Sequence, residues 1–177
     1  MLPLVLVVAI TLAVQGWRRG AFIWLTAIGG TFLTVALLKF TFLSCTPVFG
    51  PWHMSSPSGH VAAATVVTAG LAWLLSRRRP TILTAAAIVA VFIGWTRLLL
   101  HAHSVPEVLM GGAIGLTGAT LLLRYTAAPP PIRPIPLLGV ITLVVVLFHG
   151  LHLGAEAAIR DHAHNAWFIP ACRVPAD

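Results

Sequence analysis

Long apolar segments fill most of this chain, and short connections separate them. A helix that crosses a membrane needs roughly 17–25 mostly apolar residues. Six segments meet or approach that length: Leu2–Gly16, Ala21–Leu38, Val61–Leu75, Thr81–Leu100, Val105–Leu123 and Leu137–Leu153. The first is short, but it lacks the positive leading region of a secretory signal, so we interpret it as a span. The sequence therefore predicts an all-α integral membrane bundle of six transmembrane helices.

Charged residues are too scarce to build a water-exposed surface. Only 8% of the 177 residues are charged and 58% are hydrophobic, whereas a soluble domain has about 25% charged residues. This excludes a soluble globular, disordered or collagen-like protein. The net charge is +7, but the basic residues are scattered among apolar segments, so we expect no nucleic-acid partner.

The positions of the basic residues predict an orientation, because Lys and Arg concentrate in cytoplasmic connections. Seven of them fall in alternate connections: Arg18, Arg19, Arg77, Arg78, Arg79, Arg124 and Arg133. The opposite side then holds both termini and all four acidic residues. We expect one domain, residues 1–153, with an outward-facing tail, residues 154–177, in a bacterial inner membrane with its site facing the periplasm or cell exterior.

Polar side chains form three clusters on the predicted outer side. They are Lys39 with Thr46-Pro47, then Pro57-Ser58-Gly59-His60, then Thr96-Arg97 with His103 and Glu107. Polar groups near apolar segments are costly to bury, which makes them candidates for function. A topology derived from other residues places all three on one side, so we expect a single composite site.

The second cluster opens the third apolar segment. The free N–H groups and positive dipole end of a helix N-terminus bind anions, phosphate above all. Gly59 permits close approach of the backbone, and His60 can donate a proton beside a bound anion. The alternative interpretation is an N-cap Ser58 in a Pro-Gly turn with an interfacial histidine.

The third cluster combines a helix start with a histidine. Residues 104–107 have the form of a capping box with proline just inside the helix. Glu107 follows His103 by four residues, a spacing at which a carboxylate reaches an imidazole. Such a carboxylate fixes the tautomer and leaves the other ring nitrogen as a nucleophile. Arg97 has no acidic neighbour in sequence, so it either binds an anion or extends toward the interface.

These clusters resemble the signature of the type 2 phosphatidic acid phosphatase superfamily: K-x6-R-P, P-S-G-H and S-R-x5-H-x3-D. The order and spacing agree, with Lys39-x6-Thr46-Pro47, Pro57-Ser58-Gly59-His60 and Thr96-Arg97-x5-His103-x3-Glu107. The resemblance implies that His103 is a nucleophile that forms a phosphohistidine, that Glu107 orients it, and that His60 protonates the leaving group. It also implies a set of phosphate-binding residues: Lys39, Arg97, Ser58 and Gly59.

The chain departs from that signature at three positions. Thr46 stands where the family has arginine, Glu107 where it has aspartate, and Thr96 where it has serine. Threonine cannot replace a bidentate phosphate ligand. Our hypothesis is that Arg160 or Arg173 of the tail supplies the missing charge.

The remaining cysteines and histidines suggest less. Cys45 and Cys172 both fall on the predicted outer side, where a disulfide can form, although two reduced thiols are the alternative. Asp161, His162 and His164 have irregular spacing, so we interpret them as part of a polar tail and not as a metal site. We expect neither a metal ion nor a cofactor.

The sequence thus predicts a metal-independent lipid phosphatase that acts on a lipid phosphate or pyrophosphate at the outer leaflet. Its partners would be the bilayer and the lipid substrate, because six spans leave no soluble domain to capture a water-soluble one. Phosphatidic acid, phosphatidylglycerol phosphate, polyprenyl pyrophosphate and lipid A all fit. The alternatives are a lipid phosphotransferase that uses the same histidine, and a lipid-phosphate-binding protein without turnover.

Overall fold

The computed structural model describes residues 2–44, 56–76, 78–126, 134–147 and 159. These residues form an all-helical structure without strands, as the sequence predicted. Its six helices are α1 (Leu2–Val14), α2 (Arg18–Ser44), α4 (Gly59–Leu75), α5 (Arg79–Leu99), α6 (Val105–Tyr125) and α7 (Pro134–Leu147). Each helix coincides with one predicted apolar segment, although the ends differ by several residues. Helix α2 continues beyond the predicted segment to Ser44 and so includes Lys39 within the helix.

Three of the helices, α2, α5 and α6, are long and apolar enough to cross a membrane. The other three are apolar but shorter, and α1 has only 13 residues, about 20 Å of helix. Large apolar side chains cover the outer surface, as on α5, where Ile88, Val91, Phe92 and Trp95 are each at least 60% exposed. A contiguous apolar surface of this kind fits lipid and not water.

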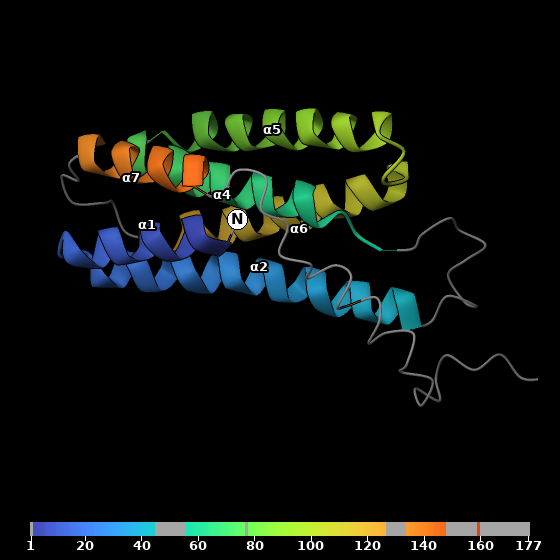
Figure 1. Ribbon diagram of the computed structural model, residues 1–177, viewed down its shortest axis with the longest axis horizontal. Coiled ribbons are helices and arrows are strands. Elements are labelled where there is room, and N and C mark those ends of the chain that lie inside the picture. Colours follow the sequence, from blue (N-terminus) through green and yellow to red (C-terminus); the bar gives the residue numbers. More distant parts are fainter. Residues whose placement is uncertain (1, 45–55, 77, 127–133, 148–158, 160–177) are drawn as a thin grey trace, which may run out of the picture.

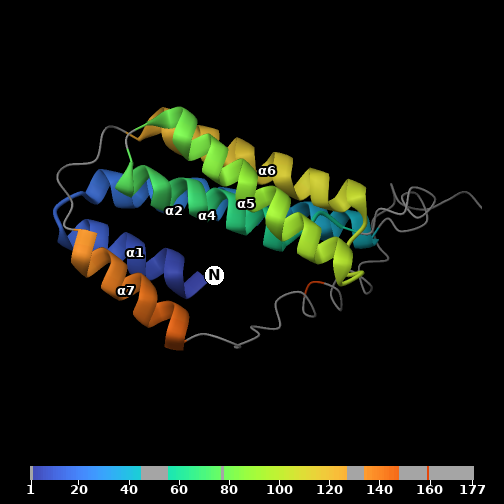
Figure 2. The ribbon, with the colours of Figure 1, turned by 90° about the horizontal axis from the view of Figure 1, so that it is seen from above.

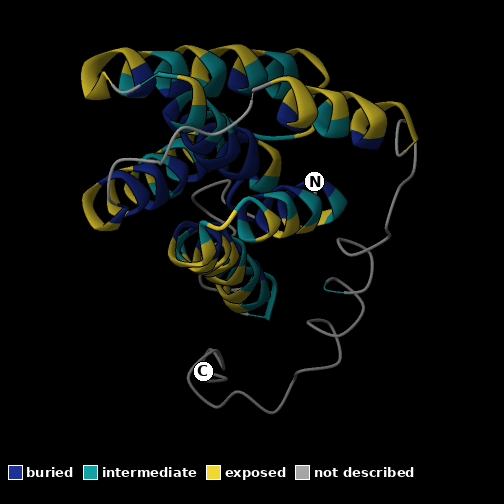
Figure 3. Cartoon of the chain, turned by 90° about the vertical axis from the view of Figure 1, so that its left-hand side faces the viewer, coloured by how far each residue is buried: buried dark blue, intermediate teal, exposed yellow. Residues whose placement is uncertain are grey.

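Helices α2, α4, α5 and α6 run alternately in opposite directions and form the body of the bundle (Figures 1 and 2). Helix α4 lies at its centre, in contact with α2, α5 and α6. Every residue from Val61 to Val67 is buried, because alanine, valine and threonine let neighbouring helices approach closely. Figure 3 shows the buried residues gathered where the helices meet and the exposed ones on the outside.

Helices α1 and α7 are additions to that body. Helix α1 packs on α2, and α7 packs on α1 through the buried Leu137 and Val144. The Trp24 indole on α2 donates a hydrogen bond to the carbonyl oxygen of Val5, at 3.0 Å, which holds α1 in place. In Figure 2 both helices lie beside the half of the bundle where α2 begins.

The alternating directions divide the charged residues between two ends of the bundle. The starts of α2 and α5 and the end of α6 carry the described members of the predicted cytoplasmic group, Arg18, Arg19, Arg78, Arg79 and Arg124. The guanidinium of Arg79 donates to the carbonyl oxygen of Leu123 at 3.4 Å, which joins α5 to α6 there. The end of α2, the start of α4, the end of α5 and the start of α6 meet at the opposite end. We call these the arginine end and the site end.

Candidate active site

The site end depends on a close approach between α6 and the turn that precedes α4. A Cβ atom added at Gly111 of α6 would overlap the carbonyl oxygen of Ser58, and one at Gly115 would lie 2.7 Å from the carbonyl oxygen of Ala62. The two glycines are one turn apart, so they let α6 lie directly against the start of α4. This spacing is visible in the sequence, but our sequence analysis did not use it.

Glu107 is the most connected side chain of this end. It is only 5% exposed. Its Oε1 accepts a hydrogen bond from the backbone N–H of Ser56 at 2.8 Å, and its Oε2 accepts one from the N–H of Ser104 at 3.0 Å. The second contact belongs to the predicted capping box, which is present at the start of α6. The contact with Ser56 was not predicted from the sequence.

His103 makes the contact that its spacing predicted. Its Nδ1 lies 3.0 Å from Oε2 of Glu107, and its side chain is 8% exposed. Because both carboxylate oxygens already accept backbone N–H groups, the carboxylate acts as an acceptor here and Nδ1 donates to it. The tautomer assigned by this network carries its lone pair on Nε2, which is the nitrogen suited to nucleophilic attack.

Ser58 is the N-cap residue of α4. Its backbone N–H donates to the carbonyl oxygen of Glu107 at 3.0 Å, so this N–H is engaged by the protein itself. The Ser58 side chain is fully buried, and its Oγ has no hydrogen-bond partner among the described residues. The first intrahelical bond runs from Ala62 N–H to the Ser58 carbonyl, so the preceding N–H groups of α4 have no intrahelical acceptor. His60, in the first turn, is exposed.

Lys39 reaches the same place from α2. It is only 6% exposed. A Cβ at Gly59 would lie 3.8 Å from Cε of Lys39 and 3.4 Å from Cγ1 of Val35. The lysine side chain therefore passes beside the first residue of α4. Lys39 of the first predicted cluster thus lies beside Gly59 of the second.

Arg97 lies in the last turn of α5. Its Nε is buried and has no hydrogen-bond partner among the described residues. The neighbouring Thr96 hydroxyl donates to the carbonyl oxygen of Ile93 at 2.7 Å, so it serves the helix. A buried Nε differs from the water-exposed head group of an arginine that extends toward the interface.

A left-handed residue makes the turn between Arg97 and His103. His101 has φ +51°, its N–H donates to the Leu98 carbonyl, and the N–H of Ala102 donates to the Arg97 carbonyl, both at 3.0 Å. This pair of bonds is a Schellman motif, which glycine usually completes. Histidine is among the residue types enriched in the left-handed region.

Several predicted residues lie outside the described part of the chain. These are the possible accessory residues Thr46, Arg160 and Arg173, the pair Cys45 and Cys172, and the tail group Asp161, His162 and His164. Their roles therefore stay predictions. Within the described residues, no three His, Cys, Asp or Glu side chains are grouped to hold a metal ion.

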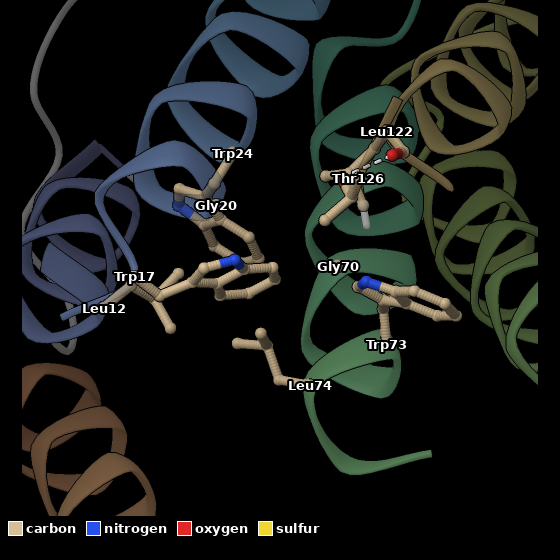
Figure 4. A pocket seen from close by; sticks show the side chains of 9 residues that line it. All are labelled: Leu12, Trp17, Gly20, Trp24, Gly70, Trp73, Leu74, Leu122 and Thr126. Carbon is tan, nitrogen blue, oxygen red and sulfur yellow. Dashed lines mark hydrogen bonds between the residues drawn. The ribbon is translucent and has the colours of Figure 1, made fainter. Parts of the chain in front are cut away.

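The arginine end contains a different feature, a small cavity of about 10 Å³ between α1, α2, α4 and α6 (Figure 4). Its lining is mostly apolar and includes Trp17, Trp24 and Trp73. A volume of this size has room for about one water molecule. The residues that line it include no acidic or basic side chain.

Comparison with known proteins identifies a family and one relative. The sequence model of the PAP2 superfamily matches residues 20–129, which include every described site residue. The chain is also similar to an uncharacterized 22.5 kDa protein in the cps region of Klebsiella pneumoniae, with 30% identity over 151 residues. That alignment covers 81% of this chain and 72% of the relative. No solved structure matches the chain.

Proposed function

The chain belongs to the PAP2 superfamily, and we propose that it is an integral membrane lipid phosphatase. A phosphatase-type activity follows from the family, whose members are generally phosphatases. The further proposal is that a lipid phosphate or pyrophosphate is hydrolysed through a phosphohistidine on His103. The same interpretation makes the chain a six-span protein with its site end at the outer face of a bacterial inner membrane.

The observation that carries this proposal is a pair of buried polar atoms at the site end. Ser58 Oγ and Arg97 Nε are both buried without a hydrogen-bond partner among the described residues. Leaving a buried donor unsatisfied costs about 1–3 kcal/mol, and more for a charged group. Phosphoryl oxygens would accept from both. The buried Lys39 adds a second positive charge beside Gly59.

The arrangement suits phosphoryl transfer in two steps. In the first, Nε2 of His103 forms a bond to phosphorus while the bond from phosphorus to the leaving oxygen breaks, and His60 gives that oxygen a proton. In the second, His60 takes a proton from water as the water oxygen bonds to phosphorus, and the bond from phosphorus to Nε2 breaks, which releases phosphate and restores both histidines. Fixed positive groups around the equatorial oxygens stabilise the transition states of both steps.

A lipid substrate is proposed because the site lies at one end of an apolar bundle. The phosphoryl group would bind near Lys39 and Arg97, and the hydrocarbon would remain among the exposed apolar side chains of the outer surface. Arg160 or Arg173 would supply the positive charge that Thr46 does not. Replacement of both arginines by alanine should then lower phosphatase activity, and unchanged kinetics would contradict this role.

Phosphate release from a panel of lipid phosphates and pyrophosphates tests the function. We expect the wild type to hydrolyse at least one of them, and His103→Ala to reduce turnover by about 10³-fold or more. His60→Ala should reduce it by about 10²–10⁴-fold, as for loss of a general acid. Thr117→Ala, on the exposed face of α6, is the control and should retain activity. No release by the wild type, or equal release by His103→Ala, would contradict the proposal.

The same panel identifies a phosphotransferase, which would move phosphate to an added lipid alcohol and release little into water. Orientation is tested separately, by labelling single cysteines from each side of the membrane in a chain whose native cysteines are replaced by serine. We expect Val105→Cys to react from outside and Arg124→Cys from inside. Reaction of both from one side would refute the proposed topology.

A further inference from the structure

Glu107 contacts two parts of the site that come from different helices. Oε2 faces its own helix, where it accepts from Ser104 N–H and from His103 Nδ1, each at 3.0 Å. Oε1 faces away from α6 and accepts from Ser56 N–H, 51 positions earlier in the chain, at 2.8 Å. One carboxylate therefore contacts both the histidine and the turn before α4.

Main-chain contacts strengthen the second connection. The carbonyl oxygen of Glu107 accepts from Ser58 N–H at 3.0 Å, and Gly111, one turn further along α6, lies against the Ser58 carbonyl. Residues 56–58 have only two backbone N–H groups, because residue 57 is proline. Both of them bond to Glu107. Both backbone hydrogen bonds of this turn to α6 are therefore made to Glu107.

We propose that Glu107 is a positioning residue that sets the separation between the phosphate-binding turn, residues 56–59, and the nucleophile His103. This inference rests on the proposed function. Its role goes beyond orienting the imidazole, because a carboxylate that held only the imidazole would not need the bond to Ser56. Shifting the turn relative to His103 would move a bound phosphoryl group off the line of attack, and such misplacement is costly in phosphoryl transfer.

The identity of the residue agrees with this role. Aspartate is one methylene, about 1.5 Å, shorter than glutamate, whereas a good N–H···O bond tolerates donor–acceptor distances of only about 2.7–3.2 Å. The bonds to Ser104 and His103 are local to the start of α6. The bond to Ser56 crosses to another element, so it is the one that a shorter side chain would lose. In this chain Glu107→Asp should therefore release the turn before it releases the histidine.

Two single variants test the connection, with binding of inorganic phosphate to the purified full chain as the main readout. Ser56→Pro removes the N–H, and it suits the backbone because a residue before proline already favours extended conformations. Ser56→Ala keeps the N–H and is the reference for loss of the hydroxyl. Relative to that reference, we expect Ser56→Pro to weaken phosphate binding about tenfold, the loss of one charge-assisted hydrogen bond. Glu107→Asp should weaken it by a similar factor relative to wild type.

The double variant Ser56→Pro/Glu107→Asp makes the test specific. If both changes break the same bond, the double variant should bind phosphate as tightly as the single variant with the lower affinity. If the two changes act independently, their fold-losses in phosphate affinity should multiply. Thermal unfolding of each variant provides the structural comparison. A residue that only stabilised the bundle would lower the unfolding temperature and leave phosphate affinity of the folded protein unchanged. That result, or multiplicative losses, would overturn the inference.

Because phosphate binding does not require turnover, failure of the inference is distinguishable from failure of the proposed function. A wild type that binds phosphate but hydrolyses no lipid phosphate would contradict the function and leave the role of Glu107 measurable. A wild type that hydrolyses lipid phosphate, with full phosphate affinity in Ser56→Pro and Glu107→Asp, would contradict only the role of Glu107. A wild type that neither binds nor hydrolyses would overturn both.

Discussion

The two ends of the bundle are held together by different forces. At the site end, Glu107 connects α6 to the turn before α4 and to His103 through hydrogen bonds of 2.8–3.0 Å. At the arginine end, Trp17, Trp24 and Trp73 surround a small cavity, and the indole of Trp24 bonds to α1. Directional bonds fix the orientation of a side chain such as His103, whereas apolar packing fixes shape and volume.

Both ends also contain buried polar atoms without a hydrogen-bond partner among the described residues, but the surroundings of these atoms differ. At the arginine end one such atom is the Nε1 of Trp73, which borders a mostly apolar cavity. At the site end the unpartnered atoms are Ser58 Oγ and Arg97 Nε, in the company of Lys39 and His103. An isolated indole donor is a small cost to stability, whereas a group of donors and positive charges is a place for an anion. Mutations at matched positions separate the two cases.

Among the variants that compare the two ends, the largest effect is expected from Arg97. Arg97→Ala should reduce kcat/KM by about 10²–10³-fold, as for removal of one donor from a charge-stabilising site. Arg97→Lys should recover only part of the loss, because lysine keeps the charge without the planar fork of donors. The matched control is Arg79→Ala on the same helix, where the guanidinium bonds to the Leu123 carbonyl at the arginine end. Steady-state phosphate release measures all three, and equal losses in Arg97→Ala and Arg79→Ala would contradict an anion site at Arg97.

A second pair of variants compares close packing at the two ends. Gly111→Ala would place a methyl group against the backbone carbonyl of Ser58, and Gly70→Ala would place one against the ring of Trp24. Both should destabilise the bundle by about 1–3 kcal/mol, as overpacking does. Only Gly111→Ala moves the phosphate-binding turn, so it should also reduce the turnover of the folded protein by up to about 10²-fold.

Thermal unfolding and phosphate release in the same detergent preparation separate these contributions. We expect Gly70→Ala to lower the unfolding temperature and keep the turnover of the folded fraction within about twofold of wild type. If both variants lost activity in proportion to stability, the site end would not be more sensitive to backbone position than the arginine end.

Local features of the site were predictable from the sequence, and contacts between distant segments were not. The capping box and the His103–Glu107 pair follow from residues three and four positions apart on one helix, and both are present. The bond from Ser56 to Glu107 joins segments 51 positions apart, and no periodicity reveals it. The end of α2 was misplaced because Lys39 was treated as a boundary, whereas its burial beside Gly59 lets the helix continue to Ser44.

A smaller effect is expected at the turn that connects Arg97 to His103. His101 adopts φ +51°, a conformation that costs a residue with a side chain roughly 1–2 kcal/mol relative to glycine. Because His101 is exposed, His101→Gly should raise the free energy of unfolding by about 1 kcal/mol without changing turnover. Thermal unfolding measures the first effect and phosphate release the second. A loss of turnover would show that the His101 imidazole takes part in the site, and the turn alone would then not explain its presence.

The smallest effects are expected from two indoles at the arginine end, one with a hydrogen-bond acceptor and one without an acceptor among the described residues. Trp24→Phe removes the bond from Nε1 to the Val5 carbonyl, and a hydrogen bond between helices of a membrane protein contributes about 0.6–1 kcal/mol. Trp73→Phe removes a donor that bonds to no described residue. Removal of this unsatisfied buried donor stabilises the folded state, which offsets the destabilisation caused by the smaller ring. We expect Trp24→Phe to be the less stable variant in thermal unfolding, and both to keep wild-type turnover. Equal destabilisation would mean that ring volume alone matters at this end, and a loss of turnover in either would mean that the two ends are not independent.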